Sequence, residues 1–186
     1  NERPGITGIA HLFEHMMFKG TPTIGTTNYP RDLEIIAAQE KVRGEMRAEE
    51  AKTRAAYRRG DIDDVAKPEN KTERYKDLEH QFNELIKQQR EVLVKNEFDK
   101  IYRSAGGAGM NAFTSDDMTA YFISVPANKL ELWMWMESER LLHPVFREFY
   151  AERDVVFEER RMRTESTPLG KFAETFNALF WESHPY

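Results

Sequence analysis

The chain has 186 residues, a formal net charge of -5 and no cysteine, which allows one well-cored domain with an appendage and excludes a disulfide framework. The acidic balance gives no electrostatic footprint for nucleic acid, and no apolar run reaches the length of a membrane span. Charged residues make up 32% of the chain and aromatic residues 12%. Polar and apolar residues must therefore be unevenly distributed, with one segment rich in solvent contacts.

The first predicted element is a buried, apolar helix over 8–18, which has no Pro or Gly after its first residue. It carries the order H-x-x-E-H, the inverzincin motif. His11 and His15 are four positions apart, so they project from one helix face and can bring two imidazoles to one ion. Glu14 lies on the flank of that face, where a general base can hold a water beside the metal. Without cysteine the ligands must be His and carboxylate, which suit zinc.

Residues 19–25 predict a helix stop and a loop, with Gly20 as a left-handed cap. From 31 to 103 the composition shifts to Glu, Lys, Arg and Gln, and two helices over 32–59 and 69–90 are expected to form a hairpin. An apolar seam with one polar member is predicted on the second arm, at Tyr75, Leu78, Phe82, Leu85, Gln89 and Val92. Such a seam also suits a dimer interface, but the Gly- and Asp-rich turn between the arms favours an intrachain hairpin.

The runs 110–114 and 118–125 alternate as strands and predict a β-hairpin. The glycine-rich run 106–109 before them is not followed by Lys-Ser/Thr, so it does not indicate a phosphate loop. Residues 127–142 predict an apolar helix whose Trp and Met side chains are expected in the core.

A further helix is predicted over 147–165. Glu152 and Glu159 are seven residues apart and share a face, whereas Glu158 points about 100° away from Glu159. A mixed charged helix is normally a solvated surface. The apolar run 155–157 indicates that part of this helix is buried, and two histidines still lack a third protein ligand.

Three motifs together resemble, in order, the zinc peptidases of the pitrilysin, insulin-degrading enzyme and mitochondrial processing peptidase family. They are the segments 11–15, 107–114 and 152–159. The resemblance covers nearly the whole chain, and it looks closest to the bacterial branch at 130–140, 144–146 and 184–186.

The resemblance implies a role for each matching residue. His11, His15 and Glu159 would bind one zinc ion per chain, and Glu14 would be the general base that activates a zinc-bound water for attack on a peptide carbonyl. Glu152 would orient a ligand histidine through its second ring nitrogen. The face shared with Glu152 favours Glu159 over the preceding glutamate as third ligand.

The resemblance also implies an α+β fold, with a two-layer antiparallel sheet backed by helices. Asn111 and Ala112 would lie on an edge strand that pairs with an extended substrate. The family encloses its substrate between two homologous halves, and an Arg-Tyr pair from the other half, which is not in this sequence, supports catalysis. Because Asn1 is not a start methionine, we expect the chain to be a fragment. Without the other half, we expect it to have little activity by itself.

The interval from His15 to Glu159 is 144 positions, far longer than is usual in the family. The excess is about the length of 31–103, so we expect 1–186 to be one partial metallopeptidase domain with a coiled-coil-like helical hairpin inserted at 31–103. The insertion is suited equally to covering the cleft, contacting a partner and limiting substrate size.

The sequence thus favours a zinc metalloendopeptidase acting on extended or unfolded peptides, with a second homologous half or subunit as partner. A non-catalytic binding or assembly subunit is the alternative. Such subunits tend to lose metal residues, whereas this chain keeps His11, Glu14, His15 and Glu159. A zinc-dependent lyase or hydrolase of small molecules is a third class, which the Asn111-Ala112 strand disfavours. The resemblance and the absence of cysteine favour the bacterial periplasm or secretion.

Overall fold

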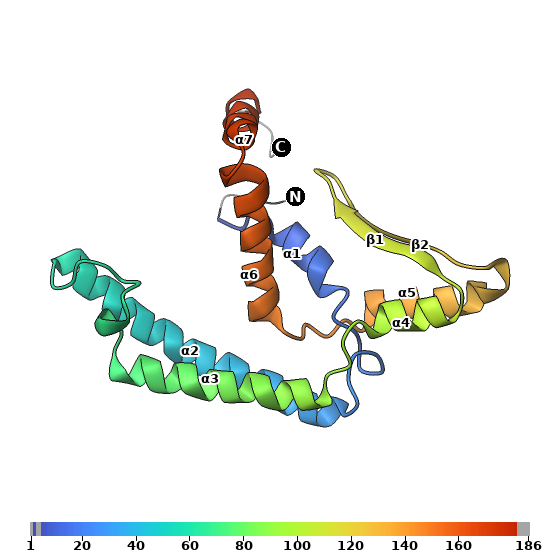
Figure 1. Ribbon diagram of the computed structural model, residues 1–186, viewed down its shortest axis with the longest axis horizontal. Coiled ribbons are helices and arrows are strands. Elements are labelled where there is room, and N and C mark those ends of the chain that lie inside the picture. The colour runs from blue at the N-terminus through green and yellow to red at the C-terminus, as the bar shows by residue number, and fades with distance from the viewer. Residues whose placement is uncertain (1, 3–4, 182–186) are drawn as a thin grey trace. The chain divides into compact units, whose positions relative to one another are not determined.

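The computed structural model describes residue 2 and residues 5–181 (Figure 1). The motif at 184–186 lies outside the described residues. The chain forms two compact units, one from Asn1–Gly25 and Lys95–Tyr186 and the other from Thr26–Val94. The first unit combines helices with a small antiparallel sheet, so the α+β class is confirmed, whereas the described sheet has two strands.

The first unit is built around helix α1, which packs against α6 and against the β1–β2 hairpin (Figure 1). Its elements are α1 (Ile9–Met16), α4 (Glu97–Ser104), β1 (Ala108–Thr114), β2 (Thr119–Ser124), the short 3-10 helix η2 (Ala127–Lys129), α5 (Leu130–Leu142), α6 (Phe149–Arg160), the π-helix η3 (Arg161–Glu165) and α7 (Pro168–Phe180). The predicted helix over 147–165 is thus observed from Phe149, with α geometry to Arg160 and π geometry over Arg161–Glu165.

The buried core of this unit joins α4, α5, the sheet and the loop after α1. Its centre is Ile24, Phe98, Tyr102 and Met136. The loop is held by Arg147, which is fully buried and donates hydrogen bonds to the carbonyl oxygens of Lys19, Thr21 and Ile24 at 3.1, 2.7 and 3.1 Å.

Gly20 does not cap α1, because this helix ends at Met16 and has Met17 as its cap. Gly20 instead turns the following loop, with φ of +107°, and a Cβ there would lie 2.2 Å from the Ile24 oxygen. Only glycine is compatible with both conditions.

Several predictions of burial were wrong. Trp133, Met134 and Trp135 of α5 are 38, 55 and 46% exposed, and only Met136 of the expected apolar set is fully buried. Helix α6 buries none of its residues, and Ile9 of α1 is 51% exposed. Apolar periodicity in a sequence does not say which segments cover a helix face.

The second unit is a helical hairpin of α2 (Tyr29–Arg59) and α3 (Glu73–Val92), with a short 3-10 turn η1 (Pro68–Asn70) between them. The Asn28 side chain caps α2 at its start, and Gly60 ends it in the left-handed conformation, with φ of 80°. The unit begins at Thr26 and ends at Val94, so α4, most of which falls within the predicted 31–103 segment, belongs to the first unit.

The interface between α2 and α3 is more polar on the α2 side than the sequence suggested. Besides Ile35 and Met46, α2 buries Asp32, Gln39, Glu49 and Thr53. Gln89 of α3 accepts a hydrogen bond from Gln39 and donates one to Asp32, both at 3.1 Å. A buried polar chain of this kind fixes the alignment of two helices, because a shift would leave its members without partners.

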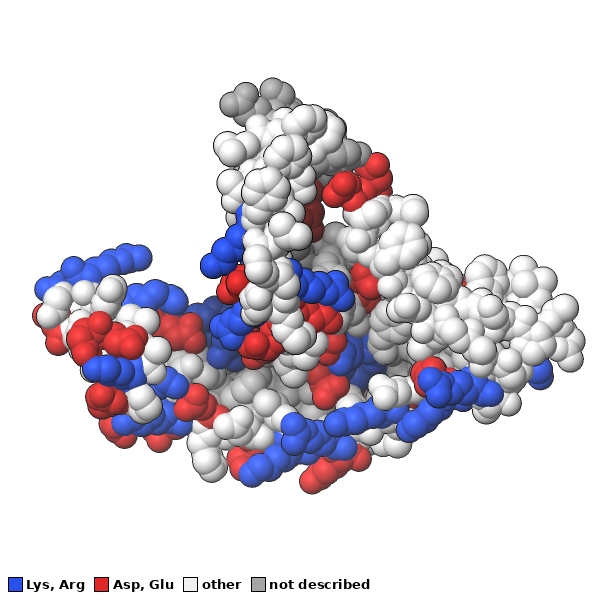
Figure 2. Space-filling view, turned by 45° about the horizontal axis from the view of Figure 1, so that its top comes forward, with Lys and Arg blue, Asp and Glu red and all other residues white. Residues whose placement is uncertain are grey.

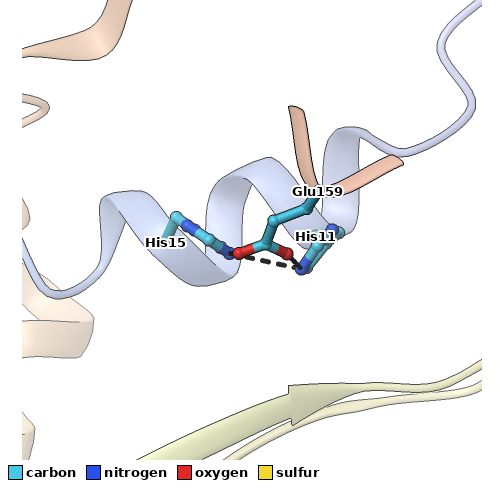
Figure 3. Close-up of side chains that lie close together, drawn as sticks. All are labelled: His11, His15 and Glu159. Atoms are coloured by element: carbon cyan, nitrogen blue, oxygen red, sulfur yellow. Dashed lines mark hydrogen bonds and ion pairs between the residues drawn. The ribbon is translucent and has the colours of Figure 1, made fainter. Parts of the chain in front are cut away.

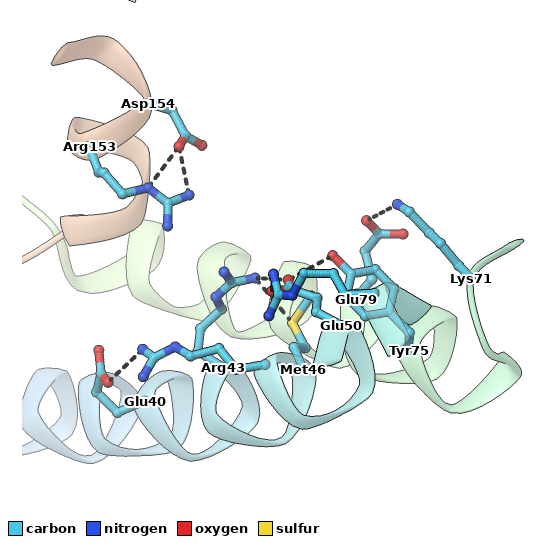
Figure 4. A network of polar contacts seen from close by, with 11 residues as sticks. Glu40, Arg43, Met46, Glu50, Lys71, Tyr75, Glu79, Arg153 and Asp154 are labelled. Atoms are coloured by element: carbon cyan, nitrogen blue, oxygen red, sulfur yellow. Dashed lines mark hydrogen bonds and ion pairs between the residues drawn. The ribbon is translucent and has the colours of Figure 1, made fainter. Parts of the chain in front are cut away.

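Ionic contacts continue along the surface of this hairpin. Figure 4 shows Glu50 near both the Arg43 guanidinium, at 3.9 Å, and the Tyr75 hydroxyl, at 3.5 Å, while Lys71 pairs with Glu79 at 3.3 Å. Figure 2 shows Lys and Arg interspersed with Asp and Glu over this unit, as the uneven composition predicts. None of the helices in the described part of the chain is both long and apolar enough to cross a membrane.

Candidate metal centre

The two histidines of α1 and Glu159 of α6 converge on one point (Figure 3). The Nε2 atoms of His11 and His15 are 3.2 Å apart. The two Glu159 oxygens lie 3.6 Å from His11 Nε2 and 3.8 Å from His15 Nε2. These side chains are 30, 18 and 23% exposed, so a ligand can reach them although they are mostly covered.

The spacing fits zinc. With metal-to-ligand distances of about 2.0–2.2 Å, the corners of a tetrahedron are about 3.3–3.6 Å apart. The 3.2 Å between the two histidine nitrogens is close to that range. The distances of 3.6 and 3.8 Å join these nitrogens to different oxygens of Glu159, and with one oxygen taken from Glu159 the three ligand atoms lie within 4.8 Å of one another. Two imidazoles and one carboxylate are also the donor set of known catalytic zinc sites.

An orphaned oxygen supports the same interpretation. Glu159 Oε2 is buried and has no hydrogen-bond donor among the described residues. His11 Nε2 and the Arg163 guanidinium each lie 3.6 Å from it, which is an ion-pair distance but too long for a hydrogen bond. A buried carboxylate oxygen without a donor is costly, and a cation between it and the histidines would remove that cost.

Glu152 determines the tautomer of His15. Its Oε1 lies 3.0 Å from His15 Nδ1, and because a carboxylate only accepts, Nδ1 carries the proton. In the neutral ring the lone pair is then on Nε2, which faces Glu159. This hydrogen bond raises the pKa of His15, opposed by burial and aided by the charge of Glu159. It likewise lowers the pKa of Glu152.

Lys19 pairs with the carboxylate of Glu152, a contact that was not predicted from the sequence. Its Nζ lies 2.6 Å from the second oxygen of Glu152 and 3.5 Å from Glu148. Lys19 lies beyond α1, which ends at Met16, so helical spacing gave no signal for this contact. The contact places the ammonium over the same carboxylate that orients His15.

Glu14 is the neighbour of His15 on α1 but is not part of the ligand cluster. It is 8% exposed, and its Oε2 accepts a hydrogen bond of 2.5 Å from the Thr114 hydroxyl of β1. It is not among the three residues whose ligand atoms gather within 4.8 Å. The arrangement suits a proton acceptor beside the metal rather than a ligand.

Glu158 is placed away from the histidines. Its side chain is 61% exposed and pairs with Arg161 on the same helix. Of the two adjacent glutamates, Glu159 is therefore the one that lies with His11 and His15.

Asn111 and Ala112 lie on β1, whose outer edge meets no strand within the described ranges 2 and 5–181. In an antiparallel pair of strands, residue pairs that are hydrogen bonded through the main chain alternate with pairs that are not. The Ser115 N–H donates to the Met118 oxygen, so the next pair, Thr114–Thr119, is not hydrogen bonded. By the same alternation, the pair Ala112–Tyr121 is not hydrogen bonded either. The N–H and C=O of Ala112 consequently point to the free edge. The exposed Asn111 side chain accepts this N–H at 2.9 Å.

His11, His15 and Glu159 form a candidate metal centre, and comparisons with known proteins support a zinc-peptidase type of function. Residues 1–59 match the model of the insulinase family, peptidase family M16. This N-terminal segment is therefore similar to that peptidase family.

One relative is the "Zinc protease PqqE" of Helicobacter pylori (strain ATCC 700392 / 26695), which is 41% identical over 96 residues, or 50% of this chain. The matched region is 21% of the length of that relative. No solved structure matches the chain. The donor set of His11, His15 and Glu159 fits zinc, the metal that the name of this relative gives.

Proposed function

We propose that the protein containing this chain is a zinc-dependent endopeptidase that hydrolyses extended or unfolded peptides. The observation that carries the proposal is the convergence of His11, His15 and Glu159, with ligand atoms within 4.8 Å of one another, next to a buried Glu14 that is not part of the cluster. A ligand set with a separate carboxylate beside it is what metal-assisted hydrolysis requires.

Each residue has a separate task in this proposal. His11, His15 and Glu159 hold one zinc ion, and Glu152 keeps His15 in the tautomer that presents Nε2. When bound, zinc supplies a Lewis acid that lowers the pKa of a water and stabilises the negative charge on the carbonyl oxygen. Glu14 accepts the proton of the attacking water and returns it to the leaving amine.

The free edge of β1 suggests how substrate is held. A peptide added as a third strand would pair with the outward N–H and C=O of Ala112. Asn111, whose side chain now accepts the Ala112 N–H, can bond to the added strand instead. An open strand edge suits an extended peptide better than a small molecule, which disfavours the lyase alternative.

The remaining proposals rest on the family. They are a processing-peptidase-like fold with Thr26–Val94 as an inserted, coiled-coil-like hairpin, a second homologous half or subunit that completes the chamber, and a periplasmic or secreted location. The ligand set and Glu14 are all in place, which disfavours the alternative of a non-catalytic assembly subunit.

The test is the variant Glu14→Gln in the full-length protein. We expect this variant to bind about one zinc per chain, as the wild type does, and its rate of hydrolysis of an unstructured peptide to fall by at least about 100-fold. Glu158→Gln is the matched control, since this glutamate is exposed and adjacent to a ligand, and it should keep both properties. The proposal is wrong if the Glu14→Gln variant still cleaves the peptide, or if the purified wild-type protein contains no metal.

A further inference from the structure

The catalytic carboxylate proposed above is held from the β-hairpin and not only from its own helix. Glu14 is 8% exposed, and β1 and β2 both pack on α1. Thr114 Oγ1 and Glu14 Oε2 are 2.5 Å apart, although the residues are 100 positions apart in the sequence. The orientation of the carboxylate therefore depends on a strand that carries none of the metal ligands.

A second hydroxyl lies behind the first. Thr114 and Thr119 are direct partners in the register of β1 and β2, and their Oγ1 atoms are 3.0 Å apart. They form a pair that is not hydrogen bonded through the main chain, in which facing side chains come closest. Threonine is restricted at χ1 by its branched Cβ, so both hydroxyls are held with little loss of freedom.

The direction of the hydrogen bonds follows from the charge of Glu14. An ionised carboxylate only accepts, so the single hydroxyl proton of Thr114 points to Glu14. The Thr114 oxygen then has only lone pairs left for Thr119, which must donate. The result is a directed chain, Thr119 to Thr114 to Glu14, in which each donor sets the orientation of the next.

We infer that Thr114 and Thr119 are positioning residues that fix the Glu14 carboxylate for proton transfer, by engaging Oε2 and leaving the other oxygen for water. This inference rests on the proposed peptidase function. A carboxylate without this anchor would rotate about its side-chain torsions, and misplacement of a reacting group by about 1 Å can cost 100-fold in rate. The β-hairpin then both pairs with the substrate and orients the base.

The experiment compares Thr114→Val, Thr114→Ser and Thr119→Val in the full-length protein. Valine keeps the branched shape and removes the hydroxyl, whereas serine keeps the hydroxyl and removes the methyl group. We expect Thr114→Val to lower kcat about 10- to 100-fold with KM and zinc content unchanged. Thr114→Ser should recover most of kcat, and Thr119→Val should lower it about 3- to 10-fold.

The matched control is Thr27→Val. This threonine bonds to the Val92 carbonyl in the helical hairpin, so its variant should keep wild-type kcat. A purely structural role for Thr114 would change zinc content or KM together with kcat, and serine would then not restore the rate. Equal kcat for wild type and Thr114→Val would overturn the inference.

A crystal structure of Thr114→Val decides the inference separately from the proposed function. We expect the Glu14 carboxylate to leave its wild-type orientation or to show more than one. An unchanged, single orientation would overturn the positioning role whether or not the protein cleaves peptides. Conversely, a wild-type protein without peptidase activity would refute the proposed function and leave this structural result to be judged by itself.

Discussion

The contact between Glu152 and His15 leads to the sharpest prediction for zinc binding. Glu152→Gln removes the charge that lies 3.0 Å from His15 Nδ1 and 2.6 Å from Lys19 Nζ. A hydrogen bond to a charged group contributes about 1.5–3 kcal/mol, which corresponds to about 10- to 150-fold in an equilibrium constant. Losses of about 10- to 100-fold in metal affinity are typical when such a partner is changed. The zinc Kd should therefore rise by at least about 10-fold.

The assay is a competition titration against a chromophoric chelator. Glu148→Gln is the control, because Glu148 contacts Lys19 at 3.5 Å and does not contact His15. Its zinc Kd should change by less than about 3-fold, as expected for a weak ion pair at the surface. If Glu152→Gln bound zinc as tightly as the wild type, the role given to Glu152 in orienting His15 would be refuted.

Three further predictions concern stability. Arg147→Met should destabilise the first unit by about 3–5 kcal/mol in urea unfolding, because three carbonyls of the loop 19–25 lose their buried cation; a loss below about 1 kcal/mol would contradict this. Gln89→Leu should cost about 1–3 kcal/mol, since it removes the bridge between two buried polar side chains. The control Gln88→Leu, which loses a surface bond to Arg31, should cost less. Burial raises the pKa of Tyr121 to about 12, above its ordinary value near 10, so the folded state favours the protonated form. Its contribution is present below pH 10 and is lost as the pH rises towards 12; the melting temperature should fall over that interval, and Tyr121→Phe should reduce the fall.

The parts of the site that depend on local spacing could be predicted from the sequence. His11 and His15 are brought together by one helical turn, and Glu152 and Glu159 by two turns of another helix. The resemblance to a known family then paired the two helices across 144 positions. Spacing alone does not predict which helices meet.

The contacts made between distant segments could not be predicted in this way. The bond from Thr114 to Glu14 joins a strand to a helix, and a strand pattern shows which face a residue takes but not what that face meets. The buried face of α2 was missed for a different reason. Gln39 and Glu49 are polar, so a search for apolar periodicity passes over them although the structure buries both.

The location of the metal tests the central claim most directly. Crystals of the full-length protein grown with zinc would be measured by anomalous diffraction at the zinc absorption edge. The account predicts one peak per chain, about 2.0–2.2 Å from His11 Nε2, His15 Nε2 and an oxygen of Glu159. A peak held by other residues, or no peak at this position, would contradict it.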